Sequence, residues 1–392
     1  MKILIISHMY PSSFNKIGGI FVHQQVKELK KQGCEITVVS PIPWTPFPIK
    51  YLSKKWKEYY KIPQKTILEN IKVYYPRYLE IPKNLFYASS GKRMYLGIKK
   101  TITKIYENFK FDIIHSHVAL PDGYCGMMVA QEYNKSLIVT IHGQDFQQTI
   151  FKNVKCKKNI EKVINFSKKT ITVSNKLNNI GKKKLKINSK KLITIPNGIN
   201  TKHISQKKSN LSKKYENKKI ILSVSSLIKT KGIDYNLKAI ARIRKKYPEI
   251  IYLIIGDGPE KENLKELANK LDISNQIEFL GQMSHKKVME YLSICDIFSL
   301  PSWNEGFGIV YLEAMAHQKP IIGVVGQGIN DVIENKKNGL LIEPKNINSL
   351  VETLNFLLYS PEIIRKIGKG AQKTVLEKYT LRKVVKQIIN FY

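Results

Sequence analysis

Short apolar runs alternate with polar, helix-forming stretches along most of the chain. The apolar runs of the first half are Lys2–Ser7, Glu35–Ser40, Asp112–His117, Leu137–His142, Thr170–Ser174 and Leu192–Pro196. Those of the second half are Ile220–Ser225, Tyr252–Gly256, Ile277–Gly281, Ile297–Leu300, Pro320–Val325 and Gly339–Ile342. Continuous apolar strands that alternate with helices indicate a parallel sheet covered on both faces. The pattern therefore predicts an α/β chain of two doubly wound, Rossmann-like domains that face each other across a cleft.

The two series of strands also predict where the domains end. Residues 1–199 form the predicted first domain, and the polar, lysine-rich residues 200–219 form a linker. Residues 220–375 form the second domain, and an amphipathic helix at about 376–392 is expected to pack back on the first. The least regular part is 41–109, where Pro43, Pro46 and Pro48 interrupt regular structure.

The stretch Ser299–Gly323 has the pattern of a strand, a turn, a helix and a second strand. Glu305 lies in the turn and Glu313 lies on the helix. The N–H groups that emerge at the start of this helix belong to Phe307, Gly308, Ile309 and Val310. A helix N-terminus carries partial positive charge and unpaired donors, so it suits a phosphate. We therefore expect a phosphate site flanked by two carboxylates that can bind sugar hydroxyls.

Three further positions follow predicted strands, where loops of a doubly wound sheet face the ligand cleft. His142 can hydrogen-bond a sugar hydroxyl or a diphosphate oxygen, unless neighbouring residues satisfy it instead. Gly18-Gly19 allows close approach of the backbone to a ligand, although such a pair also forms simple turns. Lys231 can reach a diphosphate as a point charge.

The chain lacks the patterns typical of a protein-held metal. No Asp-x-Asp occurs, and the four cysteines have no paired spacing. We expect His115 and His117 to face opposite sides of the strand that they share, which argues against a metal pair there. We therefore predict no metal and no cofactor, with lysine and helix N-termini offsetting phosphate charge.

The charge balance is strongly basic, with 66 Lys+Arg against 30 Asp+Glu and a formal net charge of +36. Lysine, asparagine and isoleucine are abundant together, as in AT-rich coding sequences, which accounts for much of this excess. In Lys50–Lys65, Trp56, Tyr59 and Tyr60 lie among lysines, a composition that suits an anionic membrane surface. A solvated cover of the domain is the alternative. The basic residues are spread over the whole chain, so we expect no specific nucleic-acid partner.

The N-terminal run MKILIISHMY has one lysine and is too short for a signal peptide, so we interpret it as a buried strand. No run reaches the roughly 18 apolar residues of a membrane span. We therefore expect a cytoplasmic protein, peripheral at the inner face of the cell membrane.

Glu305-x7-Glu313, within NEGFGIVYLEAMA, resembles the signature of retaining GT-B glycosyltransferases of family 4, the group 1 type. Supporting motifs span nearly the whole chain: Gly18-Gly19, His142-Gly143-x-Asp145, Pro196–Ile199, Lys231-Gly232, Gly256–Pro259 and Asn338–Leu341. The run from Tyr311 to Ala316 and Gly326–Ile329 are most similar to enzymes of cell-wall, capsule or exopolysaccharide assembly, including the teichuronic-acid type.

The resemblance implies a role for each candidate residue. Glu305 and His142 would be catalytic, Glu305 contacting the donor sugar and His142 lying beside sugar and phosphate. Glu313 would bind the ribose, Lys231 the diphosphate, and Gly19 and the N–H groups of Phe307, Gly308, Ile309 and Val310 other parts of the donor. Ser226 departs from the family, which commonly has arginine there, so Ser226 or a nearby lysine would contact phosphate instead.

The implied reaction moves a sugar from a nucleotide-diphosphate sugar, with UDP-sugars favoured, to a glycan or lipid-linked acceptor. The anomeric configuration would be retained, and the reaction would need no cofactor. Two alternatives stay open from the residues alone. One is a nucleotide-sugar epimerase on the same fold, and the other is a basic nucleic-acid-binding protein.

Overall fold

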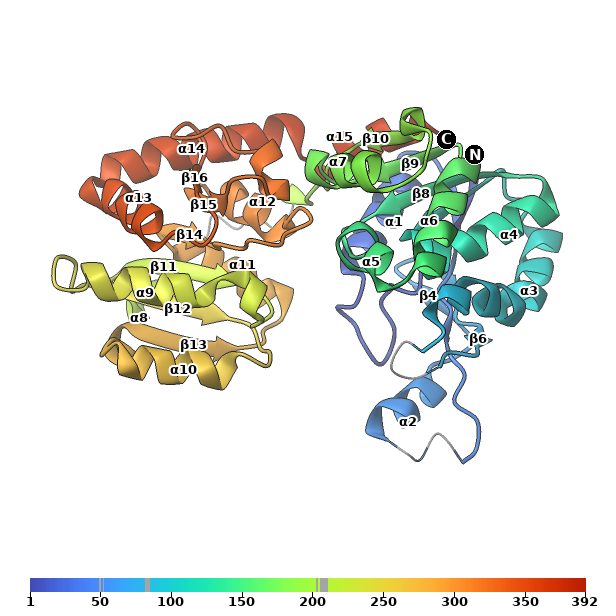
Figure 1. Ribbon diagram of the computed structural model, residues 1–392, viewed down its shortest axis with the longest axis horizontal. Helices are drawn as coiled ribbons and strands as arrows, with labels where there is room; N and C mark the ends of the chain where they lie inside the picture. The colour runs from blue at the N-terminus through green and yellow to red at the C-terminus, as the bar shows by residue number, and fades with distance from the viewer. Residues whose placement is uncertain (49–50, 52, 82–84, 202–203, 205–210) are drawn as a thin grey trace. The chain divides into compact units, whose positions relative to one another are not determined.

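The computed structural model describes residues 1–48, 51, 53–81, 85–201, 204 and 211–392 (Figure 1). These residues form two compact units. The first contains Met1–Pro196 and Val385–Tyr392, and the second contains Asn197–Val384. The described part of the predicted linker, 200–219, therefore belongs to the second unit, while residues 202–203 and 205–210 are outside the described residues.

The first unit is built on a sheet whose described strands have the order β10-β9-β8-β7-β1-β2-β5-β4. Their bounds are β1 Lys2–Ile6, β2 Glu35–Val39, β4 Lys65–Leu68, β5 Ile71–Tyr74, β7 Ile113–His117, β8 Ser136–Ile141, β9 Lys169–Thr172 and β10 Leu192–Thr194. Neighbouring strands are parallel except for β4, which pairs antiparallel with β5 at one edge. The six strands predicted for this half are all present, each within two residues of its predicted ends.

Helices connect these strands and cover the sheet. Their bounds are α1 Ile20–Lys31, α2 Lys54–Lys61, α3 Ser90–Asn108, α4 Tyr124–Tyr133, α5 Ile150–Lys152, α6 Val154–Phe166 and α7 Asn175–Lys184. Shorter helical turns are η3 Tyr87–Ser89, η4 Ala119–Gly123, η5 Asp145–Thr149 and η6 Ser189–Lys191. The core lies where the strands meet the helices, and Ile3, Leu4 and Ile5 are fully buried. Each such side chain contributes about 1.5–3 kcal/mol of burial free energy.

The segment 41–109, predicted to be the least regular part of the chain, contains more regular structure than its prolines suggest. This segment contains α2, the β4–β5 hairpin, a short pair of β3 (Ile42–Pro43) with β6 (Arg77–Tyr78), and the 19-residue helix α3. Met94, Ile98, Ile102 and Ile105 recur at helical spacing in α3 and are buried. The three prolines all lie before residue 49, so they interrupt only the start of the segment.

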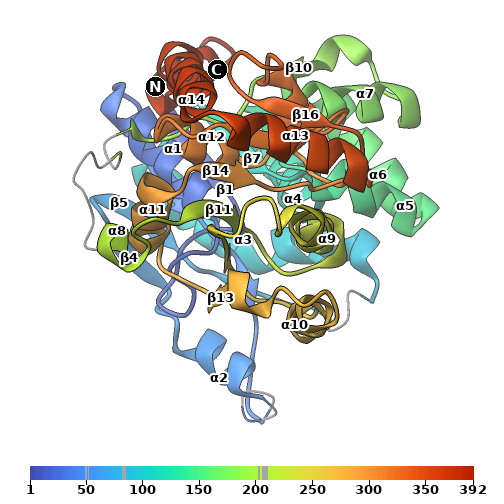
Figure 2. The ribbon, with the colours of Figure 1, turned by 90° about the vertical axis from the view of Figure 1, so that its left-hand side faces the viewer.

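The second unit has its own parallel sheet, with the described strands in the order β13-β12-β11-β14-β15-β16. Their bounds are β11 Lys219–Val224, β12 Ile250–Ile255, β13 Ile277–Gly281, β14 Ile297–Ser299, β15 Ile321–Val324 and β16 Leu340–Ile342. The helices are α8 Leu211–Lys214, α9 Ile233–Ile243, α10 Lys261–Lys270, α11 His285–Ile294, α12 Ile309–Ala316, α13 Ile347–Tyr359 and α14 Pro361–Lys378, and the last helix, α15 Leu381–Ile389, is divided between the two units. Figure 2 shows α9, α10 and α13 around this sheet.

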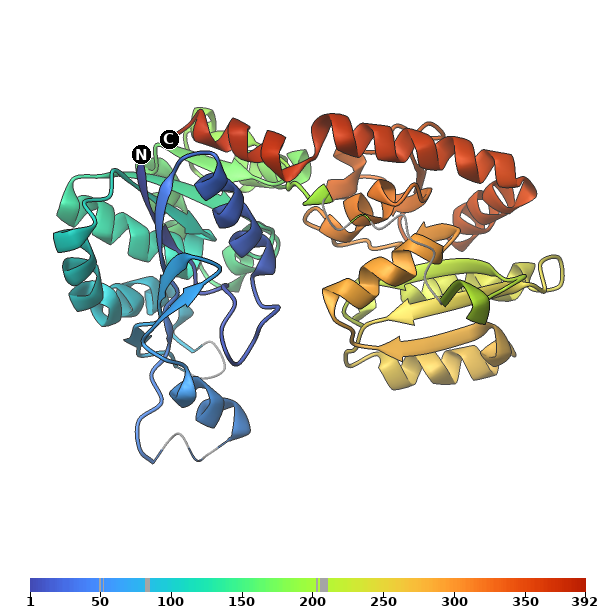
Figure 3. The ribbon, with the colours of Figure 1, turned by 180° about the vertical axis from the view of Figure 1, so that it is seen from behind.

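The end of the chain belongs to the first unit, where the residues from Val385 onward are placed. Figure 3 shows α15 following α14, with the two chain ends near each other. The hydroxyl of Tyr392 lies 2.6 Å from Nδ1 of His115 in β7. The last residues of the chain are therefore packed against the buried part of the first sheet.

In both sheets the strand order reverses at one point. In the first unit β1 lies between β2 and β7, and in the second β11 lies between β12 and β14. The chain builds each sheet outward from β1 or β11 on one side first, and later returns to add strands on the other side. The loops that follow the two neighbouring strands therefore diverge at the carboxyl ends there. Open α/β sheets bind ligands at such switch points.

Candidate active site

The switch point of the second sheet lies between β11 and β14, and their following loops are joined by backbone contacts. The N–H of Trp303 donates to the carbonyl of Thr230 at 3.1 Å. Gly232 has a φ of +71°, and a Cβ there would lie 2.3 Å from the carbonyl oxygen of Pro301. Only glycine combines this left-handed backbone with so close an approach. Gly232 therefore lets the loop that carries Lys231 lie against the loop that carries Glu305.

Lys231 and Glu305 form an ion pair at this point, with Nζ and Oε2 2.6 Å apart. Their side chains are only 19% and 14% exposed. The backbone N–H of Glu305 donates to Oε1 of Gln327, 3.0 Å away, in the loop after β15. Two residues predicted from separate motifs are thus in direct contact, and a third loop fixes the backbone of one of them.

Helix α12 begins directly after Glu305 and points its N-terminus at the same place. Gly308 precedes the helix with a φ of +86°, and as a glycine it has no side chain to cap the helix N-terminus. Phe307 is buried, and the hydroxyl of Tyr311 donates to the carbonyl of Leu300, anchoring the first turn on β14. The N–H groups predicted at Phe307, Gly308, Ile309 and Val310 therefore lie at the start of α12, beside the ion pair.

Glu313 lies one helical turn further along α12 and has a partner that the sequence did not suggest. Its Oε1 is 2.7 Å from Nε2 of His285, the first residue of α11. The hydrogen bond and charge of Glu313 raise the pKa of His285 above 6.5, although partial burial opposes this. No motif marked His285, because its approach to Glu313 depends on the packing of α11 beside α12.

The position that departs from the family, Ser226, follows β11 and is exposed. Beside it, the turn after β12 packs closely, since a Cβ on Gly256 would lie 1.8 Å from the carbonyl oxygen of Ser225. The N–H of Leu227 donates to the carbonyl of Asp257 at 2.9 Å. The Gly256–Pro259 motif thus supports the loop that carries Ser226 and leads to Lys231.

In the first unit, His142 follows β8 directly and lies against two other histidines. Its Nε2 is 3.0 Å from Nδ1 of His117 at the end of β7, and the two rings stack at 5.3 Å. His117 stacks in turn on His115 at 4.7 Å. The expectation that His115 and His117 face opposite sides was wrong, because side chains two positions apart on a strand point to the same face.

Burial keeps these imidazoles neutral. It lowers the pKa of His115 and of His142 to about 3, and that of His117 well below 6.5. His115 bonds Tyr392 and the hydroxyl of Thr140, whereas Nε2 of His117 has no hydrogen bond to a described residue. His142 is the member of this stack that reaches the surface, at the carboxyl end of the sheet.

Gly19 lies at the start of α1 with a φ of +67°, and a Cβ there would lie 2.1 Å from the carbonyl oxygen of Met9. The glycine is therefore required by the packing of the loop after β1.

Two buried carboxylates at the same end of the first sheet were not predicted as a pair. Asp145 of the His142 motif is fully buried and accepts the N–H groups of Ala119 and Leu120 at 3.0 and 3.2 Å. Burial raises the pKa of Asp145 to about 7. Asp122 is also fully buried and accepts from His8, which follows β1. His8 could have been found by the rule that singled out His142, since it lies two residues after β1 and His142 lies one residue after β8.

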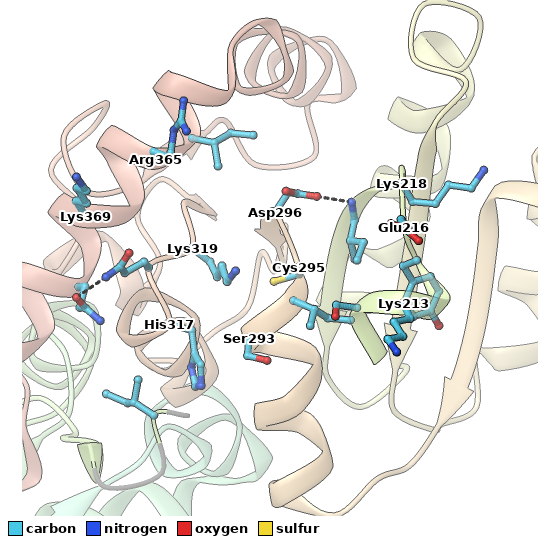
Figure 4. A pocket seen from close by; sticks show the side chains of 18 residues that line it. Lys213, Glu216, Lys218, Ser293, Cys295, Asp296, His317, Lys319, Arg365 and Lys369 are labelled. Carbon is cyan, nitrogen blue, oxygen red and sulfur yellow. Dashed lines mark hydrogen bonds between the residues drawn. The ribbon is translucent and has the colours of Figure 1, made fainter. Parts of the chain in front are cut away.

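A cavity of about 800 Å³ lies at the opposite end of the second sheet, where β11 and β14 begin (Figure 4). Its lining includes Lys213, Lys319, Arg365 and Asp296. None of the predicted site residues lines it, so it is separate from the Lys231–Glu305 site.

The described residues contain neither a metal-binding cluster nor a membrane-spanning helix. No group of three or more His, Cys, Asp or Glu in that part of the chain could hold a metal ion. None of the helices there is both long and apolar enough to cross a bilayer.

Two family models match adjoining parts of the chain. The model described as Glycosyltransferase Family 4 matches residues 18–203, and that described as Glycosyl transferases group 1 matches residues 205–374. Together they span both units. The candidate residues of each unit lie inside the model that matches it, apart from His8, which precedes the first.

Relatives match over most of their length. TuaC of Bacillus subtilis, named for teichuronic acid biosynthesis as a glycosyltransferase, is 29% identical over 385 residues, covering 95% of this chain and 94% of that protein. The alpha-monoglucosyldiacylglycerol synthase of Acholeplasma laidlawii is 29% identical over 335 residues, covering 79% of this chain and 82% of that protein.

Solved structures show the same fold. The sucrose-phosphate synthase of Thermosynechococcus elongatus has a TM-score of 0.82 at 18% identity, covering 100% of this chain and 98% of that one. HepE of Anabaena in complex with UDP and glucose has a TM-score of 0.76 at 18% identity, covering 100% and 98%. These neighbours are GT-B enzymes. The chain is therefore a member of the family 4, group 1 glycosyltransferases and has their GT-B fold.

Proposed function

We propose that the enzyme transfers a sugar from a UDP-sugar to a glycan or lipid-linked acceptor with retention of the anomeric configuration. The observation that carries this proposal is the Lys231–Glu305 pair beside the N-terminus of α12, whose N-cap residue is Gly308. A cation and a helix N-terminus suit a diphosphate, and the adjacent carboxylate suits sugar hydroxyls. The site occupies the switch point of the second sheet, where such a ligand is expected.

Each candidate residue binds a different part of the donor. Lys231 contacts the diphosphate, Glu305 the sugar hydroxyls and Glu313 the ribose, with Ser226 and Gly19 near the phosphates. Binding of a diphosphate to Lys231 releases Glu305 from the ion pair, so the carboxylate becomes available to the sugar as the donor enters. UDP is the favoured carrier, because HepE, a structural neighbour, was solved with UDP.

The bond changes follow from this arrangement. The bond from the anomeric carbon to the diphosphate oxygen breaks, and a bond from that carbon to the acceptor oxygen forms on the same face. The hydroxyl proton of the acceptor passes to the leaving diphosphate oxygen. Lys231 and the N–H groups of Phe307–Val310 stabilise the negative charge on that group. His142, neutral because of burial, lies beside sugar and phosphate as a hydrogen-bonding group.

The acceptor class is inferred from the relatives. One is named for teichuronic acid biosynthesis and another for synthesis of a glycosylated diacylglycerol. A polymer of the cell surface and a lipid both present sugar or glycerol hydroxyls. We therefore assign the enzyme to cell-surface polysaccharide or glycolipid assembly, with a cytoplasmic location at the inner face of the membrane.

The test starts from binding. Thermal unfolding is measured with UDP-glucose, UDP-galactose, UDP-N-acetylglucosamine, UDP-glucuronate and GDP-mannose, since a ligand at a hundredfold excess over its Kd adds about 2.7 kcal/mol. The donor that stabilises most is then incubated with octyl β-D-glucopyranoside and with bacterial lipid extract. Product linkage is read by NMR, and an α-linked product from an α-linked donor shows retention.

Several outcomes would contradict the proposal. A β-linked product rules out retention, and stabilisation by GDP-mannose alone rules out UDP as the carrier. Conversion of the UDP-sugar to its epimer without acceptor would place the enzyme in another reaction class. Glu262→Ala on α10 is the matched control for variants of the site, because Glu262 is exposed and pairs with nearby Lys265 on the same helix.

We also propose that α2 binds an anionic membrane surface. Figures 1 and 3 show α2 away from the sheet of the first unit, and it has no buried residue. Lys54, Lys55 and Lys57 lie on it, and exposed Trp44 and Phe47 precede it in the chain. Lys50 and Leu52, at the start of the predicted Lys50–Lys65 segment, lie outside the described residues. Basic and aromatic side chains together suit a headgroup layer.

The membrane proposal is tested by co-sedimentation with vesicles of phosphatidylcholine alone or with phosphatidylglycerol. Replacing Lys54, Lys55 and Lys57 with glutamate should release the protein from anionic vesicles at physiological salt. Reversing Lys182, Lys183 and Lys184 at the end of α7 makes the same change in charge on another exposed helix. Equal loss in both variants would show that only total charge matters.

A further inference from the structure

We propose that the imidazole of His8, oriented by the buried carboxylate of Asp122, binds a hydroxyl group of the acceptor. This inference rests on the proposed transfer reaction and adds a residue that no motif of the chain marks. It assigns an acceptor-binding group to the switch point of the first sheet. Two elements meet there, because His8 follows β1 and Asp122 belongs to η4, which follows β7.

Asp122 contacts both the ring and the backbone of His8. Nδ1 of His8 lies 2.9 Å from Oδ1 and 3.0 Å from Oδ2 of Asp122. The backbone N–H of His8 also donates to Oδ2, at 3.2 Å. Asp122 is fully buried, whereas the His8 side chain is 34% exposed. The carboxylate thus fixes both the position and the rotation of a ring that reaches the surface.

The partner of Nδ1 determines what the other nitrogen can do. An ionised carboxylate only accepts hydrogen bonds, so Nδ1 of His8 carries the proton. In the neutral ring Nε2 then has a free lone pair, as in other Asp–His pairs that orient an imidazole. No hydrogen bond from Nε2 to a described residue is present. A hydroxyl of the acceptor can therefore donate to it.

A purely structural histidine in this unit has a different pattern. His115 is fully buried, and its two ring nitrogens bond the hydroxyls of Tyr392 and Thr140. Among the described residues, His8 has side-chain hydrogen bonds through Nδ1 alone, and its side chain is 34% exposed. The turn around Asp122 is also held, because Asp145 accepts the N–H groups of Ala119 and Leu120. The protein thus holds Asp122 and Nδ1 of His8 in place, while Nε2 of His8 remains available to a ligand.

The charged groups that shift the pKa of His8 are carboxylates. Burial lowers the pKa of His8, but the charge and hydrogen bond of Asp122, with smaller contributions from Glu80 and Asp145, outweigh this and raise it above 6.5. Protonation puts a hydrogen on Nε2 and removes the lone pair. Acceptor binding through His8 should therefore be weak below this pKa and grow as the pH rises through it.

The experiment compares wild type with His8→Gln, Asp122→Asn and Glu80→Gln. Rates are measured at several pH values with UDP-glucose and UDP-N-acetylglucosamine as donors and octyl β-D-glucopyranoside or bacterial lipid extract as acceptor. UDP affinity is measured by calorimetry for each variant. Circular dichroism and thermal unfolding show whether each variant is folded, and NMR of the His8 ring gives its titration in wild type, Asp122→Asn and Glu80→Gln.

We expect His8→Gln to lower kcat/KM for the acceptor roughly tenfold above the His8 pKa, the effect of one lost hydrogen bond. The fall in acceptor kcat/KM at low pH, which follows the protonation of His8 in wild type, should disappear in this variant. UDP affinity should be unchanged. Asp122→Asn donates to Nδ1 and moves the ring proton to Nε2, so it should lower acceptor kcat/KM at least as much. Glu80→Gln should lower the His8 pKa slightly and shift the acid limb with it, leaving the plateau rate unchanged.

The outcomes separate this inference from the function on which it rests. A wild type that transfers sugar, beside a folded His8→Gln with the same rate and pH profile, overturns the role of His8 alone. Rates that fall rather than rise as the pH passes the His8 pKa also overturn it. No transfer by wild type from either donor, without stabilisation by UDP, contradicts the proposed function and with it the acceptor role.

Discussion

The two switch points of this enzyme are built from opposite chemistry. In the second unit the strand ends present Lys231, Glu305 and Glu313, partly exposed groups whose partners are other charged groups or an imidazole. In the first unit they present stacked histidines and two buried carboxylates. Burial lowers the pKa of His115 to about 3 and raises that of Asp145 to about 7, which favours the neutral form of these two groups.

The difference fits the two substrates that the proposed reaction joins. A diphosphate is recognised by charge, so its site needs side chains that stay ionised and can exchange partners. An acceptor hydroxyl is neutral, and a positioned uncharged imidazole can bind it without a charge-desolvation cost. The same sheet architecture thus supports both sites, and the burial of the side chains at the strand ends decides which ligand each can bind.

The largest expected effect tests the buried carboxylate of the first unit. The pKa of Asp145 is about 7 in the folded protein and 3.8 ordinarily, so between these values the folded state binds more protons than the unfolded state. Stability from this group therefore falls as the pH rises, by about 1.4 kcal/mol per pH unit. Relative to Asp145→Asn, wild type should lose about 3 kcal/mol between pH 4 and pH 7. Urea unfolding, followed by hydrogen exchange in the first unit, measures this.

The comparison fails if the stability difference between wild type and Asp145→Asn stays constant over that range. It is the change with pH that matters, because the substitution also alters the hydrogen bonds to Ala119 and Leu120 by a fixed amount.

The next effect tests the charged site of the second unit. Glu305→Ala should lower kcat of transfer about a hundredfold, because the contact to the sugar strengthens as positive charge develops at the anomeric carbon. The fold should be unchanged, since only part of one ion pair is lost. Glu262→Ala is the control, and its rate should equal that of wild type. Turnover of Glu305→Ala near that of wild type would remove Glu305 from the site.

A third prediction concerns the glycine that brings the two loops together. Gly232 and Gly281 have φ values of +71° and +72°, but an added Cβ would meet Pro301 only at Gly232 and open space at Gly281. Both alanine variants lose about 1 kcal/mol to the left-handed backbone. Gly232→Ala should lose about 2 kcal/mol more from the clash, measured by urea unfolding. Equal losses would show that the close approach contributes nothing.

The smallest effect is on donor affinity. Lys231→Ala should weaken UDP binding roughly tenfold in calorimetry, because one charge-assisted hydrogen bond to the diphosphate is lost. Lys265→Ala is the control, an exposed lysine on α10 whose carboxylate partner is also exposed. If Lys229→Ala weakens UDP binding and Lys231→Ala does not, the neighbouring lysine has taken the place of the family's arginine.

Much of the second unit could be predicted from the sequence. The strand from Ile297, the turn with Glu305 and the helix from Ile309 lie where the pattern placed them, each within one residue. Glycine, acidic and apolar residues there stand at fixed local spacing, so local rules suffice. By contrast, the prolines at the start of 41–109 concealed α3, whose buried face is visible only through its spacing over four turns.

The sequence by itself determined the alternation of strands and helices, the two-domain organisation and the family, because each depends on local periodicity or on short motifs. Only the tertiary structure decided which side chains meet. Lys231 contacts Glu305 across 74 positions, and His8 contacts Asp122 across 114. Such contacts depend on strand order and register, which bring loops distant in the sequence to one edge of a sheet. The sequence indicated Glu305 and Glu313 beside a helix N-terminus. The folded sheet adds Lys231 as the partner of Glu305 and His285 as the partner of Glu313.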